Sequence, residues 1–302
     1  MRSKITTAVL VSLLGLAASA CGGGGDAKPT QAAPAAQGDS ALVELLPEDI
    51  KKSRVVKGGS SFTTPPLYTF EADGKTPSGV LIKLIENAAE HMGVTVEWSQ
   101  IPYAGIIPGM NSGKIDISGS QFSATAANLE AANILSVYKN TVALVVPAKE
   151  KTSYTEGDLT GACGRDLAVV RGSTIEPPAV EKINTVCRDA GKPEAKSVPF
   201  GGAADALTAI KAGRVDGFLL SYASAVYDSE KSSGEFATVF GGQFEKYPSG
   251  FAIQKDQTRL AEAFRAAFDA TIKDGSYAKI MESYNMPADL YATEAGLNEQ
   301  AQ

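Results

Sequence analysis

Hydrophobic and polar residues alternate along the chain with two periods, one of about 2 residues and one of about 3.6 residues. Residues 53–57 are a candidate strand, and residues 94–101, VTVEWSQI, alternate as a second strand does. Between them lies a helical pattern that Gly93 closes, with apolar side chains at Val80, Leu81, Leu84, Ile85, Ala88 and Met92. Residues 105–108 open another helix, and a short apolar run follows at 115–117. This order is typical of a parallel sheet in an α/β lobe.

The second half of the chain repeats the alternation of strands and helices. Residues 141–148, TVALVVPA, are a strongly apolar candidate strand, and residues 167–170 are another. The run AADALTAIK predicts an amphipathic helix that stops at Gly213, before a buried strand at 217–222. Residues 260–284 predict a pair of helices near the C-terminus. A second α/β lobe is therefore expected.

The beginning of the chain has the composition of an export signal. Two basic residues are followed by a short apolar core, which is shorter than the roughly 20 residues that a membrane span needs. We therefore expect residues 1–20 to be a signal peptide and Cys21 to be a lipidated anchor at a lipobox-like junction. Ala18 stands where that motif prefers leucine. Ordinary cleavage after an alanine is the alternative.

Residues 21–41 are predicted to be a flexible tether from the lipidated cysteine. Gly, Ala, Pro, Gln and Ser dominate this stretch, which cannot bury enough apolar surface to order itself. The remaining chain is long enough for one large or two medium domains. A net charge of −6 without a basic cluster argues against nucleic acid as a partner. No second hydrophobic span follows, so the chain is not expected to form a channel.

Two cysteines remain beside Cys21, at Cys163 and Cys187. In an oxidising compartment they can pair across the loop between them. Metal binding is the competing interpretation, but the chain has no CxxC spacing and its single histidine, His91, lies far away in sequence. A structural disulfide is favoured, and His91 is expected to be solvated. No metal site or cofactor is predicted.

Two polar segments follow apolar strands directly and precede helices. In the first, residues 121–125, Ser123 or Thr125 can cap a helix that we expect to end near Tyr138. The second is residues 172–174, Gly-Ser-Thr. Backbone N–H groups at a helix start lack partners within the helix, so either segment can hold an acceptor group of a small molecule. A plain helix cap is the alternative.

Several motifs occur in an order that resembles a known family. Residues 112–117, SGKIDI, are matched in the second half by KAGRVDG at 211–217. A double proline, an ADGK turn, the run GIIPGM and the C-terminal helical pair accompany them. Over residues 53–287 the chain resembles family 3 extracellular solute-binding proteins, the receptors of polar amino acid ABC importers.

The resemblance implies an α/β chain with the two-lobed, type II periplasmic-binding-protein fold. Each lobe is expected to be a mainly parallel sheet flanked by helices. Lobe 1 would comprise residues 42–145 and 250–302, and lobe 2 residues 146–249. Two hinge crossings, near residues 145–148 and 244–251, would join the lobes.

The resemblance also implies a ligand site between the lobes. In the family, an aromatic residue before the GIIP-like motif, here Tyr103, faces the ligand. The turn at residues 172–174 corresponds to one that grips one end of the ligand, often its carboxylate. The residues expected to bind the ligand are Phe62, Thr64, Tyr103, Gln121, Phe122, Ser123, Asn128, Gly172, Ser173, Thr174 and Ser221.

Two positions depart from the family pattern. Members that bind α-amino acids hold the carboxylate with an arginine and the ammonium with an aspartate, and these positions are Asn128 and Ser221 here. A buried zwitterion without ionic partners loses several kcal/mol of charge solvation, on the order of the cost of burying unpaired polar groups. We therefore expect a small polar solute, nitrogen-containing or aromatic, other than a standard α-amino acid.

The predicted function is an extracytoplasmic solute-binding receptor, anchored to the membrane by lipid and monomeric, that delivers its ligand to an ABC permease and its ATPase subunits. A lipid-anchored ligand sensor is one alternative. An enzyme on the same fold, such as a dehydratase, is another, but the expected cleft positions provide no histidine, cysteine or paired carboxylate. No catalytic residue is predicted.

Overall fold

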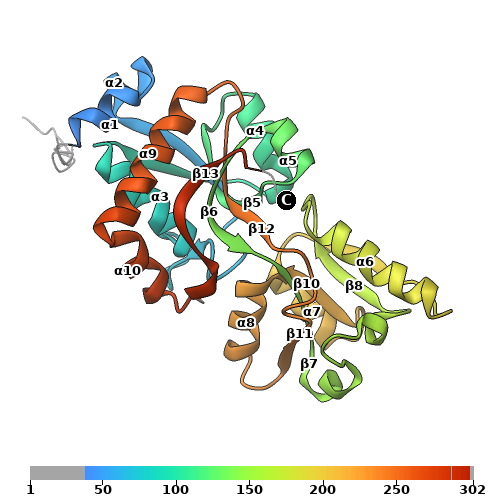
Figure 1. Cartoon of the computed structure of the whole chain (residues 1–302). Coiled ribbons are helices and arrows are strands. Elements are labelled where there is room, and N and C mark those ends of the chain that lie inside the picture. The colour runs from blue at the N-terminus through green and yellow to red at the C-terminus, as the bar shows by residue number, and fades with distance from the viewer. Residues whose placement is uncertain (1–37, 287, 300–302) are drawn as a thin grey trace, which may run out of the picture. The chain divides into compact units, whose positions relative to one another are not determined.

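The computed structural model describes residues 38–286 and 288–299, which form two large β-sheets with helices packed against them, and one small two-stranded sheet (Figure 1). The predicted signal peptide, Cys21 and most of the tether lie outside the described residues. Residues 40 and 41 of the predicted tether belong to helix α1 (Ser40–Leu45), whose N-cap Asp39 accepts a hydrogen bond from the Ala41 N–H at 2.9 Å. None of the helices in the described ranges is long and apolar enough to cross a bilayer.

The first sheet has six strands in the order β13-β6-β12-β5-β1-β4. Its strand β1 pairs in parallel with β4 and β5, whereas β12 runs antiparallel between β5 and β6. The strands are β1 (Val55–Ser60), β4 (Thr95–Gln100), β5 (Ile117–Ser123), β6 (Asn133–Asn140), β12 (Tyr247–Ile253) and β13 (Tyr291–Leu297).

Long amphipathic helices cover this sheet and bury its core. Helices α3 (Val80–His91), α9 (Thr258–Asp274) and α10 (Ser276–Ser283) contribute to one hydrophobic cluster with strand residues such as Phe251. The ring of Phe251 contacts Phe264 of α9 at a centroid distance of 5.6 Å. Each fully buried side chain of this size contributes about 1.5–3 kcal/mol.

The remaining elements of this part are short. They are α2 (Glu48–Ser53), α4 (Ile106–Asn111), α5 (Ala126–Ala131), the hairpin of β2 (Thr69–Phe70) and β3 (Pro77–Ser78), and the 3-10 turns η1 (Tyr103–Gly105) and η4 (Ala288–Leu290).

The second sheet has five strands in the order β11-β7-β10-β8-β9. Alternate residues of β7 enter two separate hydrophobic clusters, Leu144 beside Ile183 of α6 and Val145 beside Ile210 of α7, so both faces of this sheet are covered. The strands are β7 (Val142–Pro147), β8 (Asp166–Val170), β9 (Lys196–Phe200), β10 (Gly217–Ser221) and β11 (Phe236–Val239). The helices are α6 (Glu176–Asp189), α7 (Ala203–Lys211) and α8 (Tyr222–Lys231), with 3-10 turns η2 (Ala148–Ser153) and η3 (Leu159–Ala162).

The chain changes sheets twice. The first change is at Thr141, between β6 and β7, and not at the predicted residues 145–148, because β7 pairs with β10 and β11. The second lies between β11 and β12, where residues 240–246 overlap the predicted crossing. The Thr141 hydroxyl donates to the Phe244 carbonyl at 3.1 Å, so the two crossings are hydrogen-bonded to each other.

Both sheets are mixed, and the prediction of mainly parallel sheets is wrong. The strands next to the crossings, β6, β7 and β12, all pair antiparallel with their neighbours. The chain neighbours of these strands across the crossings lie in the other sheet, so each pairs with strands that are distant in sequence. The parallel pairs, β1 with β4 and β5 and β8 with β9 and β10, are connected through helices, as parallel pairing requires.

The segment after β5 also differs from its prediction. Strand β5 continues through the polar cluster to Ser123, where the sequence indicated a strand exit. Helix α5 ends at Ala131, and Tyr138 lies in strand β6 instead of near a helix end. Residues 133–138 include β-branched and aromatic side chains that pack into the sheet core, and this burial overrides the helical pattern of the preceding alanines.

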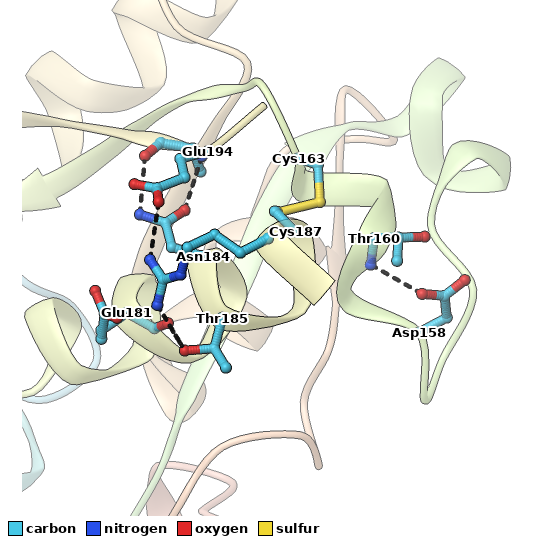
Figure 2. Close-up of a disulfide and its surroundings, with 10 residues drawn as sticks. Asp158, Thr160, Cys163, Glu181, Asn184, Thr185, Cys187 and Glu194 are labelled. Carbon is cyan, nitrogen blue, oxygen red and sulfur yellow. Dashed lines mark hydrogen bonds and ion pairs between the residues drawn. A yellow bond between two sulfur atoms is a disulfide. The ribbon is translucent and has the colours of Figure 1, made fainter. Parts of the chain in front are cut away.

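The predicted disulfide between Cys163 and Cys187 is present, with a Cα–Cα distance of 5.5 Å (Figure 2). It ties the end of η3 to helix α6. Asn184, one turn before Cys187, is hydrogen-bonded to Ala195 through both side-chain atoms, at 2.8 and 3.2 Å. Helix α6 is therefore fixed at its C-terminal end from two directions. His91, expected to be solvated, is half-buried and pairs with Asp274 at 2.8 Å.

Replacing both Cys163 and Cys187 with serine is expected to lower the free energy of unfolding by about 3 kcal/mol. The disulfide spans a sequence separation of 24 residues, and its removal restores chain entropy to the unfolded state. Urea denaturation of wild type and double variant measures this loss. Wild-type protein kept reduced is the control and is expected to match the variant; equal stability of variant and oxidised wild type contradicts the prediction.

Candidate functional site

A polar cavity lies where the two sheets face each other, and both sheets supply its walls. Its volume is about 30 Å³, which leaves room for only a few water molecules. A solute larger than a few waters therefore requires the two sides to move apart before it enters. The first side contributes Thr64, Tyr68, Tyr103, Gln121 and Ser123, and the second contributes Val170, Ser173, Thr174, Ile175, Glu176, Leu220 and Ser221.

Two tyrosines form the aromatic part of the wall. Tyr103, in η1, stacks on Phe122 at a centroid distance of 5.2 Å and donates its phenol hydrogen to the Gln121 carbonyl at 2.9 Å. Tyr68 is 4% exposed. Burial raises the pKa of both phenols, so both stay neutral at physiological pH. The tyrosines offer ring faces and phenol oxygens, and no charge.

A hydrogen-bonded bridge connects the two sides at one edge of the cavity. Asn128, on α5, donates its side-chain amide to the Thr174 hydroxyl oxygen at 2.8 Å and to the Ser123 carbonyl at 2.8 Å. Thr125, the N-cap of α5, donates to the same Thr174 oxygen at 3.2 Å. Because Thr125 and Asn128 follow β5 and Thr174 follows β8, these bonds hold the two sheets together across the cavity.

The serines of the cavity are engaged with other polar groups. Ser221, at the end of β10, donates to the Asn140 side-chain oxygen at 2.9 Å. Ser123 shares a hydrogen bond of 2.6 Å with Ser249 of β12. The side-chain nitrogen of Gln121 reaches the Ser123 oxygen at 3.5 Å. These bonds fix the side chains in place before any solute binds.

One acidic residue, Glu176, lines the cavity and is 2% exposed. Its Oε2 atom has no hydrogen-bond partner. Burial raises the pKa of Glu176 to about 7, and the Ser173 hydroxyl and the residue's own backbone N–H offset part of that rise. A buried acid with a displaced pKa in a cleft is a frequent mark of a functional site. No lysine, arginine or histidine belongs to the cavity lining in the described residues.

The sequence patterns did not single out Tyr68 or Glu176. An acidic residue in the first turn of a helix is ordinary, because it complements the helix dipole, so its position alone carried no signal. Tyr68 follows the double proline in a loop without periodicity. Only the folded chain shows that both side chains point into the same space as the serines and threonines.

Seven of the predicted ligand-binding residues line the cavity, namely Thr64, Tyr103, Gln121, Ser123, Ser173, Thr174 and Ser221. Four others lie around it. Phe62 stacks on Phe70 at 4.4 Å and lines a neighbouring groove, and Phe122 is buried behind Tyr103. Asn128 forms the bridge described above. Gly172, at φ +85°, meets Ala104 across the cavity edge, where an added Cβ would lie 3.3 Å from the Ala104 Cβ.

The raised pKa of Glu176 predicts how stability depends on pH. Between about pH 4.5 and pH 7 the folded chain keeps a proton that the unfolded chain releases, so the unfolding free energy falls as the pH rises, by at most about 3 kcal/mol. Glu176→Gln stays neutral and is expected to remove the share of this dependence that Glu176 contributes; burial also raises the pKa of Asp228 to about 7, so the share of Asp228 remains. Urea denaturation at about pH 5 and about pH 8 measures it. The exposed acid of α5 provides the control, Glu130→Gln, which should keep the wild-type slope; an unchanged slope in Glu176→Gln contradicts the prediction.

Known proteins resemble this chain over most of its length. The arginine-binding protein ArgT of Corynebacterium glutamicum is 27% identical over 256 residues, covering 85% of this chain and 82% of that protein. The L-cystine-binding protein TcyA of Bacillus subtilis is 25% identical and covers 91% of this chain and 94% of its own. An ancestral arginine-binding protein, solved bound to arginine, is 28% identical with a TM-score of 0.66, covering 76% of this chain and 97% of that structure.

The predicted type II periplasmic-binding-protein fold is confirmed by this structural similarity. A family model also covers most of the described residues. The model of bacterial extracellular solute-binding proteins, family 3, matches residues 56–287. Because the match spans well over half of the chain, this protein belongs to the family 3 bacterial extracellular solute-binding proteins.

Proposed function

We propose that this protein is the extracytoplasmic receptor of an ABC importer, which captures a small polar, nitrogen-containing solute between its two sheets and delivers it to a permease and its ATPase. The single observation that carries the proposal is the polar cavity whose walls come from both sheets and whose edge is closed by the Asn128–Thr174 hydrogen bond. A solute held there contacts both sides at once, so its binding favours the closed arrangement.

Closure is supported by close contacts between the two sides beyond the bridge. A Cβ placed on Gly202, which precedes α7, would lie 2.8 Å from the Thr63 Cβ, so only glycine allows this approach. The two crossings, joined by the bond from Thr141 to Phe244, are the places where the chain can bend. Binding shifts the equilibrium between open and closed forms only by the solute's differential affinity for the closed one.

The solute class follows from the wall. Apart from Glu176, the polar side chains that line the cavity are neutral, and tyrosine rings form part of its surface. The relatives are named for arginine and cystine, which are nitrogen-containing solutes of suitable size. The positions that would hold a carboxylate and an ammonium in α-amino acid receptors carry Asn128 and Ser221, so this protein recognises its solute through other groups.

A binding role, without chemistry, is supported by the side chains present. Histidine and cysteine do not occur among the described residues that line the cavity, and Glu176 has no second acid beside it. The relatives are named as binding proteins. We also propose a lipid anchor at Cys21, a monomeric receptor and no nucleic-acid partner. A ligand sensor that signals to a kinase has the same binding machinery, and the gene neighbourhood distinguishes it from an importer subunit.

A thermal-shift screen of the chain from Leu42 onward tests the proposal. At a hundredfold excess over its dissociation constant a true ligand adds about 2.7 kcal/mol to stability, which raises the melting temperature visibly. The panel contains amino acids, amines, amides, betaines, sugars and small aromatics. We expect a shift with a nitrogen-containing solute. A shift with sugars alone, or a change of mass in a candidate solute after incubation, contradicts the proposed receptor function.

Closure itself is tested by Gly202→Ala. The backbone at Gly202 is extended, with φ 177°, so alanine adopts it without strain and the only new contact is the one with Thr63. We expect about a tenfold weaker affinity for the solute found in the screen, measured by calorimetry. Gly201→Ala is the matched control, because its Cβ meets only the Asp205 carboxylate at 3.8 Å. Equal affinities of the two variants would count against closure at this contact.

A further inference from the structure

Several hydrogens at the cavity wall and its edge are already engaged inside the protein. The side-chain amide of Asn128 has two N–H groups, and both donate, one to the Ser123 carbonyl and one to the Thr174 hydroxyl. The Ser221 hydroxyl donates to Asn140, and the Tyr103 phenol donates to the Gln121 carbonyl. Of these groups, Ser221 and Tyr103 line the cavity, and with their hydrogens engaged their oxygens can only accept a hydrogen that the solute supplies.

The helix start beside the cavity is also a poor site for an anion. Pro177 and Pro178 stand in the first turn of α6, and neither has a backbone N–H. The N–H of Ser173 donates to the Val170 carbonyl at 3.1 Å, and that of Ile175 donates to the Ser173 hydroxyl at 3.4 Å. Four of the six residues from Ser173 to Pro178 therefore have no backbone N–H available to cradle a carboxylate at this helix N-terminus.

Glu176 gives the described cavity lining a negative charge that no basic lining residue balances. Its buried carboxylate has one oxygen without a partner, and no cationic side chain belongs to the cavity lining in the described ranges. Arg171, the nearest cation in sequence, is exposed and donates to the Pro199 carbonyl at 3.2 Å. An unpaired buried carboxylate is costly, and a cation that enters the cavity removes that cost while it gains a charge-assisted hydrogen bond.

We propose that the solute is an organic cation bearing an ammonium or guanidinium group and no carboxylate, and that Glu176 is its counter-ion. This inference rests on the proposed receptor function and narrows it to one solute class. A guanidinium has five N–H donors and an ammonium three, which match the acceptor oxygens of Glu176, Ser221 and Tyr103. A solute with a carboxylate places a second negative group beside Glu176, where the described lining has no cationic side chain to receive it.

The test compares two probes that differ by one carboxylate. Agmatine and arginine share the same guanidinium and chain, and agmatine lacks the carboxylate; calorimetry at about pH 8 keeps Glu176 ionised. We expect wild-type protein to bind agmatine, or a simple diamine such as putrescine, at least tenfold more tightly than arginine. Glu176→Gln is expected to weaken the binding of that cation at least tenfold.

The control variant is Asp228→Asn. Asp228, on α8, is also buried and also has an unpaired carboxylate oxygen, but it does not line the cavity. Its replacement is expected to leave the affinity for the cation unchanged. Equal or tighter binding of arginine overturns the inference, as does unchanged cation affinity in Glu176→Gln. If no cation probe binds while a neutral solute of the screen does, the inference is overturned and the receptor function stands; if no solute of any class binds, the receptor function itself is overturned.

Discussion

The hydroxyl oxygen of Thr174 is the point on which the closed arrangement depends. It accepts hydrogen bonds from Asn128 and Thr125, which belong to the other side of the cavity. The geometry of these bonds is set locally on each side. Thr125 caps α5, because its hydroxyl oxygen accepts a hydrogen bond from the Asn128 backbone N–H. Thr174 lies in the turn between β8 and α6. The starts of two helices therefore hold the two sides of the cavity together, through the latch formed by the hydrogen bonds of Thr125 and Asn128 to Thr174.

The latch has a consequence for recognition. The side chain of Asn128, which the family resemblance matches to a carboxylate-binding arginine, is hydrogen-bonded to Ser123 and Thr174 of the protein itself. Ser221 shows the same change of use, because its hydrogen is engaged by Asn140. Both side chains are neutral, so neither offers the charge that a zwitterion needs at the positions where the resemblance expects one. Glu176 is the one acidic side chain in the described cavity lining, which contains no basic one. Its carboxylate attracts a cation, whereas the arginine of the family pattern attracts an anion.

The sequence predicted those elements well in which the apolar residues follow a helix or strand period over the whole length of the element. Helices α3, α7 and α9 and strands β4, β7 and β10 follow directly from the spacing of their apolar residues. It failed at β6, because short alanine-rich residues before it favour a helix and only pairing with β12 and β13 makes the segment a strand. It also misplaced the first crossing, since β6 and β7 form one nearly continuous apolar run around Thr141 and the change of partner leaves no trace in hydrophobicity.

The candidate site shows the same division between local and long-range information. Helix caps and turns depend on residues that are neighbours in sequence, so the sequence could identify Ser123, Thr125 and Thr174. Which hydrogens these residues have left for a solute depends on partners far away in sequence, such as Asn140 for Ser221, at a separation of 81 residues. The residue types at the cavity therefore indicate a neutral, versatile surface, whereas the hydrogen bonds of Ser221 and Tyr103 leave their oxygens as acceptors near one buried carboxylate. Neighbouring residues reveal which polar side chains can line the cavity, but only the folded chain reveals the bonds that these side chains already make.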